Sequence, residues 1–399
     1  MSATGQQPDH DVVIVGAGLV GLSLAAALAR SGLSVAIVDR HTIAAANEAD
    51  THADNWDSRV YAVSPGSAEF LHGQGVWQRV PAERIAPIHA MEIYGDDRGH
   101  VSFDAYDLGE RSLAWIVENR ELNAALVAAV RAIAEIEVLA PCVPESIAWR
   151  GHCAEIRLAE GRLVTARLVV GADGVHSWAR REAGMLHDPQ PYHQQGVVAN
   201  FATEVAHRGR AFQWFLGDRG VLAWLPLPGK RVSIVWSAPD ALAAELLTLD
   251  PVALGERVAE AGGHALGRLE TISAVAGFPL SLLKLPFVVS HRFALIGDAA
   301  HGVHPLAGQG VNLGFGDAAA LAAVLGSRGA VGDVGAPILL ERYARRRAAP
   351  VLAMQTVTDG LVRLFGMPAP WAQVLRNRGM RAVDAVRPLK RLLAQPALR

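Results

Sequence analysis

An uncharged apolar run near the N-terminus constrains this chain more than any other feature: residues 12–29 read VVIVGAGLVGLSLAAALA. A membrane-spanning helix needs about 20 apolar residues, so the length of the run alone does not exclude a span. A secretory signal peptide starts with a basic region, but Asp9 and Asp11 precede this run and no lysine or arginine occurs before Arg30. The run also contains three glycines at a spacing that a targeting segment does not require.

The run is explained more completely as a strand, a turn and a helix. Residues 11–15 are mostly β-branched and predict a short strand, and residues 16–21, GAGLVG, match the pattern GxGxxG. Residues 22–31 favour a helix, and residues 33–38 favour a second strand that ends at Asp39. These are the parts of a dinucleotide-binding unit in their usual order.

Each part of this unit has a physical role. Gly16 makes the tight turn, Gly18 lets a pyrophosphate approach the backbone, and Gly21 lets the helix pack on the strand. The N-terminus of the helix favours an anion, and Asp39 is expected to bind ribose hydroxyls. An acid at this position argues against a 2′-phosphate and hence against NADP in this pocket, which leaves FAD or NAD.

Two further segments combine a strand with a glycine turn. Residues 293–301, FALIGDAAH, continue into a glycine-rich stretch and then an Ala/Leu-rich helix, and residues 168–180, LVVGADGVHSWAR, contain an Asp-Gly turn at Asp173. In the first of these, an acid at a strand end precedes a helix N-terminus. Asp298 can therefore bind a polyol hydroxyl, while nearby backbone N–H groups bind an electron-rich ring edge.

Together these segments resemble the single-component FAD-dependent aromatic hydroxylases, which have the fold of p-hydroxybenzoate hydroxylase. The resemblance is closest to the ubiquinone-biosynthesis hydroxylases of the UbiH, UbiF and VisC type. Three segments carry this closer resemblance: DSR at 57–59, WIVENREL at 115–122 and HPLAGQGVNLG at 304–314. It covers about residues 10–350, and the last of these segments is the most specific.

The resemblance implies FAD as cofactor, with NAD(P)H as a transient electron donor and O₂ as co-substrate. In the family the GxGxxG turn binds the ADP part of FAD, the motif here at Asp173 supports FAD and the visiting NADPH, and the motif here at Asp298 holds the ribitol. Arg59 and Arg120 match family positions near the cofactor. The predicted cofactor-binding residues are Gly16, Gly18, Gly21, Asp39, Arg59, Arg120, Asp173, Gly297, Asp298, Pro305, Gly308, Gly310 and Asn312.

No catalytic side chain is predicted, because the resemblance implies that the flavin carries the chemistry and the protein binds, orients and excludes water. In agreement, the sequence has no GxSxG or HExxH motif. His301 and His304 have a spacing that can bind a metal. They lie in a Gly/Pro turn with no third ligand nearby in sequence, so no metal site is predicted.

The middle of the chain predicts an antiparallel sheet over the flavin. Short strand-like runs separated by turn signals fill residues 196–236, residues 90–107 are expected to add strands, and residues 241–265 predict helices across the back. Aromatic side chains in these runs can contact an apolar substrate or belong to the hydrophobic core. The substrate candidates are Trp214, Phe215 and Trp224.

The predicted fold is α/β, α+β overall: a Rossmann-like FAD-binding domain with an inserted antiparallel-sheet substrate domain and C-terminal helices. The expected segments are 1–85, 111–190 and 291–355 for the FAD-binding domain, 86–110 and 191–290 for the substrate sheet, and 356–399 for basic amphipathic helices.

Charge is unevenly distributed along the chain. The 37 basic and 39 acidic side chains give a net charge of −2, which argues against a nucleic-acid binder with a broad basic face. Residues 361–399 hold eight basic side chains and one acid, a net of +7, which leaves −9 for the rest. Apolar residues recur there at helical spacing. Such a tail can lie on an anionic membrane surface or pack on the FAD-binding domain.

The sequence therefore predicts an enzyme, an FAD-dependent monooxygenase that hydroxylates the ring of a polyprenylated phenol in ubiquinone biosynthesis. We expect it in the cytoplasm, peripheral on the inner face of the membrane, with a quinone-biosynthesis complex as a partner. Two alternatives remain open: a flavin hydroxylase of a small soluble phenol, and a non-catalytic flavoprotein subunit of a biosynthetic complex.

Overall fold

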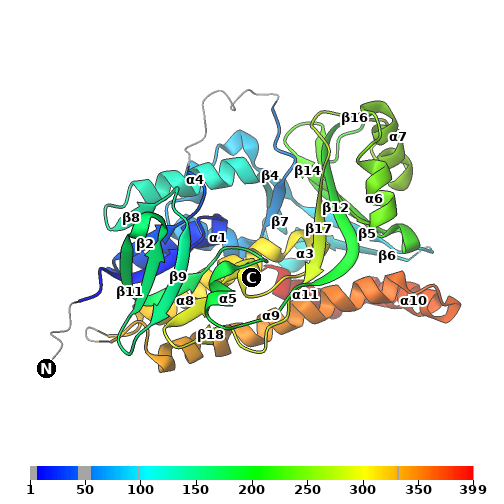
Figure 1. Ribbon diagram of the computed structural model, residues 1–399. Coiled ribbons are helices and arrows are strands. Elements are labelled where there is room, and N and C mark those ends of the chain that lie inside the picture. Colours follow the sequence, from blue (N-terminus) through cyan, green and yellow to red (C-terminus); the bar gives the residue numbers. More distant parts are fainter. Residues whose placement is uncertain (1–6, 44–54, 98, 330–331, 399) are drawn as a thin grey trace, which may run out of the picture.

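Two large sheets stand side by side, and a long helix runs beneath both of them (Figure 1). The computed structural model describes residues 7–43, 55–97, 99–329 and 332–398. A small third sheet joins β3 (Val60–Val63), β7 (Ala114–Glu118) and β4 (Ala86–Ile88). Two short helices lie elsewhere: α2 (Pro65–Gly73) packs on α8, and α3 (Ala105–Leu108) packs on β6.

The first large sheet has the order β18-β19-β11-β1-β2-β8, and its central strands are parallel. The hairpin β9–β10 extends it next to β11. All four residues of β2 are buried, as in a sheet that is covered on both faces. The strands are β1 (His10–Val15), β2 (Val35–Val38), β8 (Ile136–Leu139), β9 (Pro144–Trp149), β10 (Ala154–Leu158), β11 (Leu163–Gly171), β18 (Val289–Ser290) and β19 (Phe293–Leu295).

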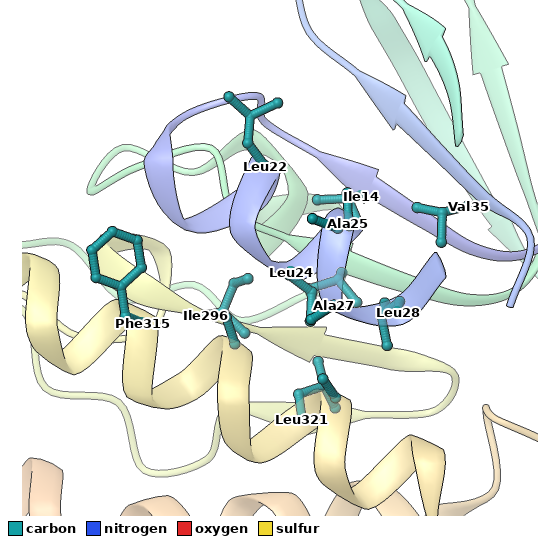
Figure 2. Close-up of a cluster of buried hydrophobic side chains, with 14 of the residues drawn as sticks. Ile14, Leu22, Leu24, Ala25, Ala27, Leu28, Val35, Ile296, Phe315 and Leu321 are labelled. Carbon is teal, nitrogen blue, oxygen red and sulfur yellow. The ribbon is translucent and has the colours of Figure 1, made fainter. Parts of the chain in front are cut away.

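Three helices cover one face of this sheet: α1 (Leu19–Ala29), α4 (Asn119–Arg131) and α8 (Gly310–Gly326). Figure 2 shows Leu24 and Leu28 of α1 in one cluster with Leu321 of α8. Ten of the eleven residues of α1 are buried, which explains a helix that is apolar all round. Within the described residues, no helix is long and apolar enough to cross a membrane.

The second large sheet has the order β16-β12-β15-β14-β13-β5-β6, with β17 next to β12. As expected, residues 90–107 contribute two of its strands, and α6 (Asp240–Leu246) and α7 (Pro251–Ala261) cover one face. Its strands are β5 (Ala90–Tyr94), β6 (His100–Asp104), β12 (Gln190–Thr203), β13 (Arg210–Phe215), β14 (Val221–Leu227), β15 (Arg231–Pro239), β16 (Leu269–Thr271) and β17 (Ala276–Leu282).

The C-terminal part forms α9 (Pro337–Gly366), α10 (Pro370–Ala385) and α11 (Arg387–Leu398). Helix α9 begins well before residue 356, where the tail was expected to start. Helix α10 packs on β6 of the antiparallel sheet. This differs from one of the two interpretations of the tail, which placed it on the FAD-binding domain. Two hydrogen bonds support this contact: Nε of the buried Arg376 donates to Asp96 beyond β5, and the N–H of Ser102 in β6 donates to Asp384 of α10.

Candidate functional site

The three glycine turns converge on one cavity of about 660 Å³, which is within the range of small-molecule and cofactor sites. The cavity lies at the carboxyl ends of β1, β2, β11 and β19, where open α/β sheets bind ligands. The predicted residues that line it are Gly16, Gly18, Asp39, Arg59, Asp173, Gly297, Asp298 and Gly310.

The first glycine turn exposes the N-terminus of α1 to this cavity. Gly16 has a φ of +110°, and a Cβ there would lie 2.5 Å from the carbonyl oxygen of Ala172. A Cβ on Gly21 would lie 2.0 Å from the carbonyl oxygen of Gly16. Both positions therefore require glycine for packing. A Cβ on Gly18 would meet no protein atom within 4 Å, so the space beside Gly18 is open to a ligand.

Asp39 closes the first turn from the end of β2. Its Oδ2 accepts a hydrogen bond from the backbone N–H of Ala17 (2.7 Å), and its Oδ1 accepts one from the N–H of His41 (2.8 Å). These bonds fix the carboxylate at the wall of the cavity. Each carboxylate oxygen has a further lone pair, so Asp39 can still accept a hydrogen bond from a ligand hydroxyl.

Asp298 presents a second carboxylate to the cavity just after β19. The Asp298 side chain is open to the cavity, but the protein atoms crowded around it raise the pKa of this carboxyl, while His301 and Arg59 act in the opposite direction. A hydroxyl-bearing ligand that donates to Asp298 would supply the hydrogen bonds that stabilise the charged form.

A buried network behind Asp298 was not predicted from the sequence. Asp317 of α8 accepts hydrogen bonds from the N–H of Gly297 (2.9 Å) and from Nε2 of His301 (2.6 Å) through Oδ2. Its Oδ1 accepts a hydrogen bond from Nε of Arg347 on α9 (2.6 Å). The network fixes the turn that carries Asp298. One signal could have indicated it: Asp317 is the only charged residue in the apolar sequence of α8.

The electrostatics of the network favour charged groups. Burial lowers the pKa of His301, but Asp317 outweighs this effect and the net pKa is raised. Burial raises the pKa of Asp317, yet His301 and Arg347 hold it below its ordinary value. The cluster therefore favours an anionic Asp317 between Arg347 and the protonated form of His301.

Asp173 caps a helix as well as lining the cavity. Its Oδ2 accepts a hydrogen bond from the N–H of Ala179 in α5 (Trp178–Glu182), and its Oδ1 accepts one from the hydroxyl of Ser177. The buried Arg180 donates to the carbonyls of Val175 and Ala299. Arg180 thus connects the Asp173 turn to the Asp298 turn.

The other five predicted cofactor residues lie near the cavity but are not among its lining residues. The amide of Asn312 donates to the carbonyl of Ala62 and accepts from the N–H of Ser64, which holds the start of α8 against β3. The guanidinium of Arg120 donates to the carbonyl of Asn55 (2.6 Å). The five are Gly21, Arg120, Pro305, Gly308 and Asn312, and their roles toward a cofactor stay predictions.

The three aromatic substrate candidates lie on different faces of the antiparallel sheet. Trp224 is fully buried under α7, because a Cβ on Gly262 at the end of that helix would lie 2.2 Å from its indole. Trp214 packs against Trp224 in the same core. This packing favours the core interpretation for both. Phe215 lies on the opposite face, stacked on Phe365 and clustered with Leu306, and its contact with substrate stays a prediction.

The two histidines of the HxxH sequence have different partners. His301 bonds to Asp317, whereas Nε2 of His304 lies 3.1 Å from Oε1 of Gln194. Within the described residues, no group of three His, Cys, Asp or Glu side chains could hold a metal ion. Burial lowers the pKa of His304 to about 4.

The low pKa of His304 predicts a pH effect on stability. The unfolded chain binds a proton at this residue near pH 6.5 and the folded chain only near pH 4, so stability falls as the pH drops through this window. We expect His304 to destabilise the fold by about 2 kcal/mol more at pH 5 than at pH 7. In chemical denaturation, the loss of stability from pH 7 to pH 5 should be about 2 kcal/mol larger in the wild type than in His304→Gln. An equal loss in both proteins would contradict the assignment.

The sequence matches a known family and several characterised proteins over most of its length. Residues 9–358 match the family described as FAD binding domain. The chain is 36% identical to ubiquinone hydroxylase UbiL of Rhodospirillum rubrum over 97% of this chain and 89% of the relative. It is 34% identical to 3-demethoxyubiquinol 3-hydroxylase of Escherichia coli over 97% of this chain and 98% of the relative.

A solved structure resembles the whole arrangement. PqsL from Pseudomonas aeruginosa, described as a probable FAD-dependent monooxygenase, superposes with a TM-score of 0.78 at 25% identity. The match covers 94% of this chain and 99% of PqsL. The similarity therefore extends over both sheets and not only over the glycine turns.

Proposed function

This chain belongs to the family of FAD-dependent monooxygenases that includes the ubiquinone hydroxylases, and we propose that it hydroxylates the aromatic ring of a polyprenylated phenol in ubiquinone biosynthesis. One oxygen atom of O₂ enters a ring C–H bond and the other leaves as water, with two electrons from NAD(P)H. The names of the relatives support ubiquinone biosynthesis as the pathway.

The observation that carries the proposal is the cavity in which Gly18, Asp39 and Asp298 converge. The open space beside Gly18 and the exposed N-terminus of α1 fit a pyrophosphate. Asp39 fits the hydroxyls of the adenosine ribose, and Asp298 fits those of the ribitol chain. When bound, FAD would accept two electrons from a nicotinamide and activate O₂, which is the chemistry that hydroxylation requires.

The protein's own residues then bind, orient and exclude water. Arg59 faces the cavity beside Tyr61, and its guanidinium lies 5.5 Å from the ring centre. Arg180 and Asp317 hold the Asp173 and Asp298 turns in place. NAD(P)H is proposed to dock transiently, since the sequence contains one complete GxGxxG unit.

The test is the response of the purified, FAD-loaded protein to phenols. An ortho-prenylphenol with a short tail should accelerate NAD(P)H-driven flavin reduction by about tenfold or more and should gain one oxygen atom. Asp298→Ala should lose the yellow colour and the activity. Greater acceleration by a small, tail-free phenol would favour the first alternative. A colourless wild-type protein that still supports quinone synthesis would favour the non-catalytic subunit.

We further propose peripheral contact with an anionic membrane through α10. Trp371 and Leu375 are 64% and 59% exposed, whereas Arg376 of the same helix is buried. The exposed Arg378 and Arg381 add positive charge to this helix. Apolar and basic side chains on one exposed helix suit the headgroup region of a bilayer, from which a polyprenylated phenol would have to be taken up.

Replacing both apolar side chains by glutamate should weaken this contact. Each buried side chain contributes about 1.5–3 kcal/mol, so Trp371→Glu with Leu375→Glu should lower binding to phosphatidylglycerol vesicles by about 100-fold or more. Sedimentation with vesicles at low salt measures this. Val252→Glu, at an equally exposed site on α7, should bind like the wild type. Unchanged sedimentation of the double variant would exclude α10 as the contact.

A further inference from the structure

Two of the segments that carry the closer family resemblance, 57–59 and 115–122, meet beside the cavity. Strand β3 follows the first segment and pairs with β7 of the second, so that Val60 lies directly opposite Glu118. Arg59 of the first segment and Asn119 of the second both line the cavity. The side chains that join the two segments therefore influence how this wall of the cavity is built.

The carboxylate of Glu118, at the end of β7, is the centre of this junction. The residue is fully buried. Its Oε1 accepts a hydrogen bond from the backbone N–H of Asp57 (2.6 Å) and lies 3.5 Å from Nη2 of Arg120. Its Oε2 accepts a hydrogen bond from Nη1 of Arg84 (3.2 Å). Buried charges are normally paired and hydrogen-bonded, and Glu118 satisfies this requirement with donors from three separate parts of the chain.

The same two arginines hold the main chain that leads to Arg59. The guanidinium of Arg84 lies 4.4 Å from the ring centre of Trp56, within the range of a cation–π contact. The guanidinium of Arg120 donates to the carbonyl of Asn55 (2.6 Å). Through these arginines, one buried carboxylate fixes the residues directly before the cavity.

Arg59 itself is fixed through its backbone. Its N–H donates to Oδ1 of Asp57 (2.9 Å), and its carbonyl accepts from the N–H of Asn119 (2.8 Å). Oδ2 of Asp57 accepts from the N–H of Arg120 (3.1 Å), so Asp57 is bonded to both segments. Because the side chain of Arg59 lines the cavity, these bonds determine where its positive charge lies.

We propose that Glu118 is a positioning residue that holds Arg59 at the cofactor through Asp57. This inference rests on the proposed function, in which FAD occupies the cavity. It goes further by assigning a role to a buried carboxylate that is not among the residues lining the cavity. A cation that is already in place loses little conformational freedom when the anionic pyrophosphate of FAD binds, so its attraction is retained as affinity.

Glu118→Gln and Asp57→Asn test this link. Glutamine has one acceptor oxygen where Glu118 has two, so one of the donors around it must face an amide N–H₂ group. The dissociation constant of FAD, measured by fluorescence titration of the apoprotein, should rise about tenfold in each variant. Asp57→Asn leaves Arg84 paired with Glu118, so it tests the link even if Glu118→Gln does not fold.

The Arg59→Ala background separates positioning from a general loss of structure. Arg59→Ala alone should raise the dissociation constant of FAD about tenfold or more, and adding Glu118→Gln or Asp57→Asn should raise it no further. If Glu118 had a merely structural role, Glu118→Gln would weaken FAD binding by the same factor in both backgrounds. That result would overturn the proposal, as would an unchanged FAD affinity of Arg59→Ala.

The control variant is Asp333→Asn, which also removes a carboxylate from a buried guanidinium. Asp333 accepts two hydrogen bonds from Arg292, which directly precedes β19, whereas Asp298 follows this strand. The variant should lower the unfolding midpoint but keep the wild-type FAD affinity. If the wild type hydroxylates a phenol and Glu118→Gln and Asp57→Asn bind FAD as it does, the link is wrong and the proposed function stands. If the wild type binds no FAD, both are wrong.

Discussion

Gly18→Val is expected to abolish FAD binding while the apoprotein stays folded. Gly18 has φ −72° and ψ 178°, an extended conformation that valine adopts readily. A Cβ at this position meets no protein atom within 4 Å and projects into the space proposed for the pyrophosphate. We expect at least a 100-fold loss of FAD affinity, equivalent to about 3 kcal/mol, in a fluorescence titration of the apoprotein.

Two other glycines make this result interpretable. Gly73→Val at the end of α2 also adds a side chain to open space, but away from the cavity, and should bind FAD like the wild type. Gly21→Val should destabilise the fold itself, because its Cβ would overlap the carbonyl oxygen of Gly16. If Gly18→Val bound FAD with unchanged affinity, the pyrophosphate could not lie against this turn.

Asp317→Asn is expected to have the largest effect on stability. The substitution leaves His301 and Arg347 buried without the carboxylate that they share. Loss of one partner from a buried ion pair costs about 3–5 kcal/mol, and chemical denaturation should show a loss of that size. FAD affinity should also fall, because the single amide oxygen of asparagine cannot accept both from the Gly297 N–H and from Arg347, so the hold on the Asp298 turn is weakened.

The pH dependence of stability shows whether the effect of Asp317→Asn comes from lost charge interactions or from altered packing. The raised pKa of His301 means that its protonation stabilises the folded wild type at low pH and that this contribution is lost as the pH rises through the raised value. Without Asp317, burial lowers the pKa of His301, so protonation then opposes folding. The stability difference between the proteins should therefore grow as the pH falls through the ordinary histidine pKa of about 6.5. Glu341→Gln, in an exposed pair with Arg345, should change stability by less than about 0.5 kcal/mol at any pH.

Local patterns were sufficient to predict the glycine turns. The GxGxxG turn, the strands beside it and Asp39 lie within about 30 residues, so short-range spacing determines their geometry. The helix begins at Leu19 rather than at residue 22, because Gly18 already serves as its N-cap. Alternation likewise indicated the strands of the antiparallel sheet and the helices on its back.

Long-range partners could not be predicted in this way. Asp317 and Arg347 are thirty residues apart and meet only after α8 and α9 pack. Whether Trp214 and Trp224 lie in the core depends on which face of the sheet α6 and α7 cover. A shift of the strand register by one residue would move both side chains to the other face. The attachment of α10 to the β5–β6 hairpin depends on Arg376 and Asp96, which are 280 residues apart.

The order of the strands also determines when the protein can fold during synthesis. Strand β5 pairs with β13, whose residues are made more than a hundred positions later, and β11 gains its partner β19 only near residue 293. Asp96 gains its partner Arg376 even later, 280 residues further along the chain. Neither sheet can therefore close until most of the chain has left the ribosome, and until then strand edges, which are prone to aggregation, stay unpaired.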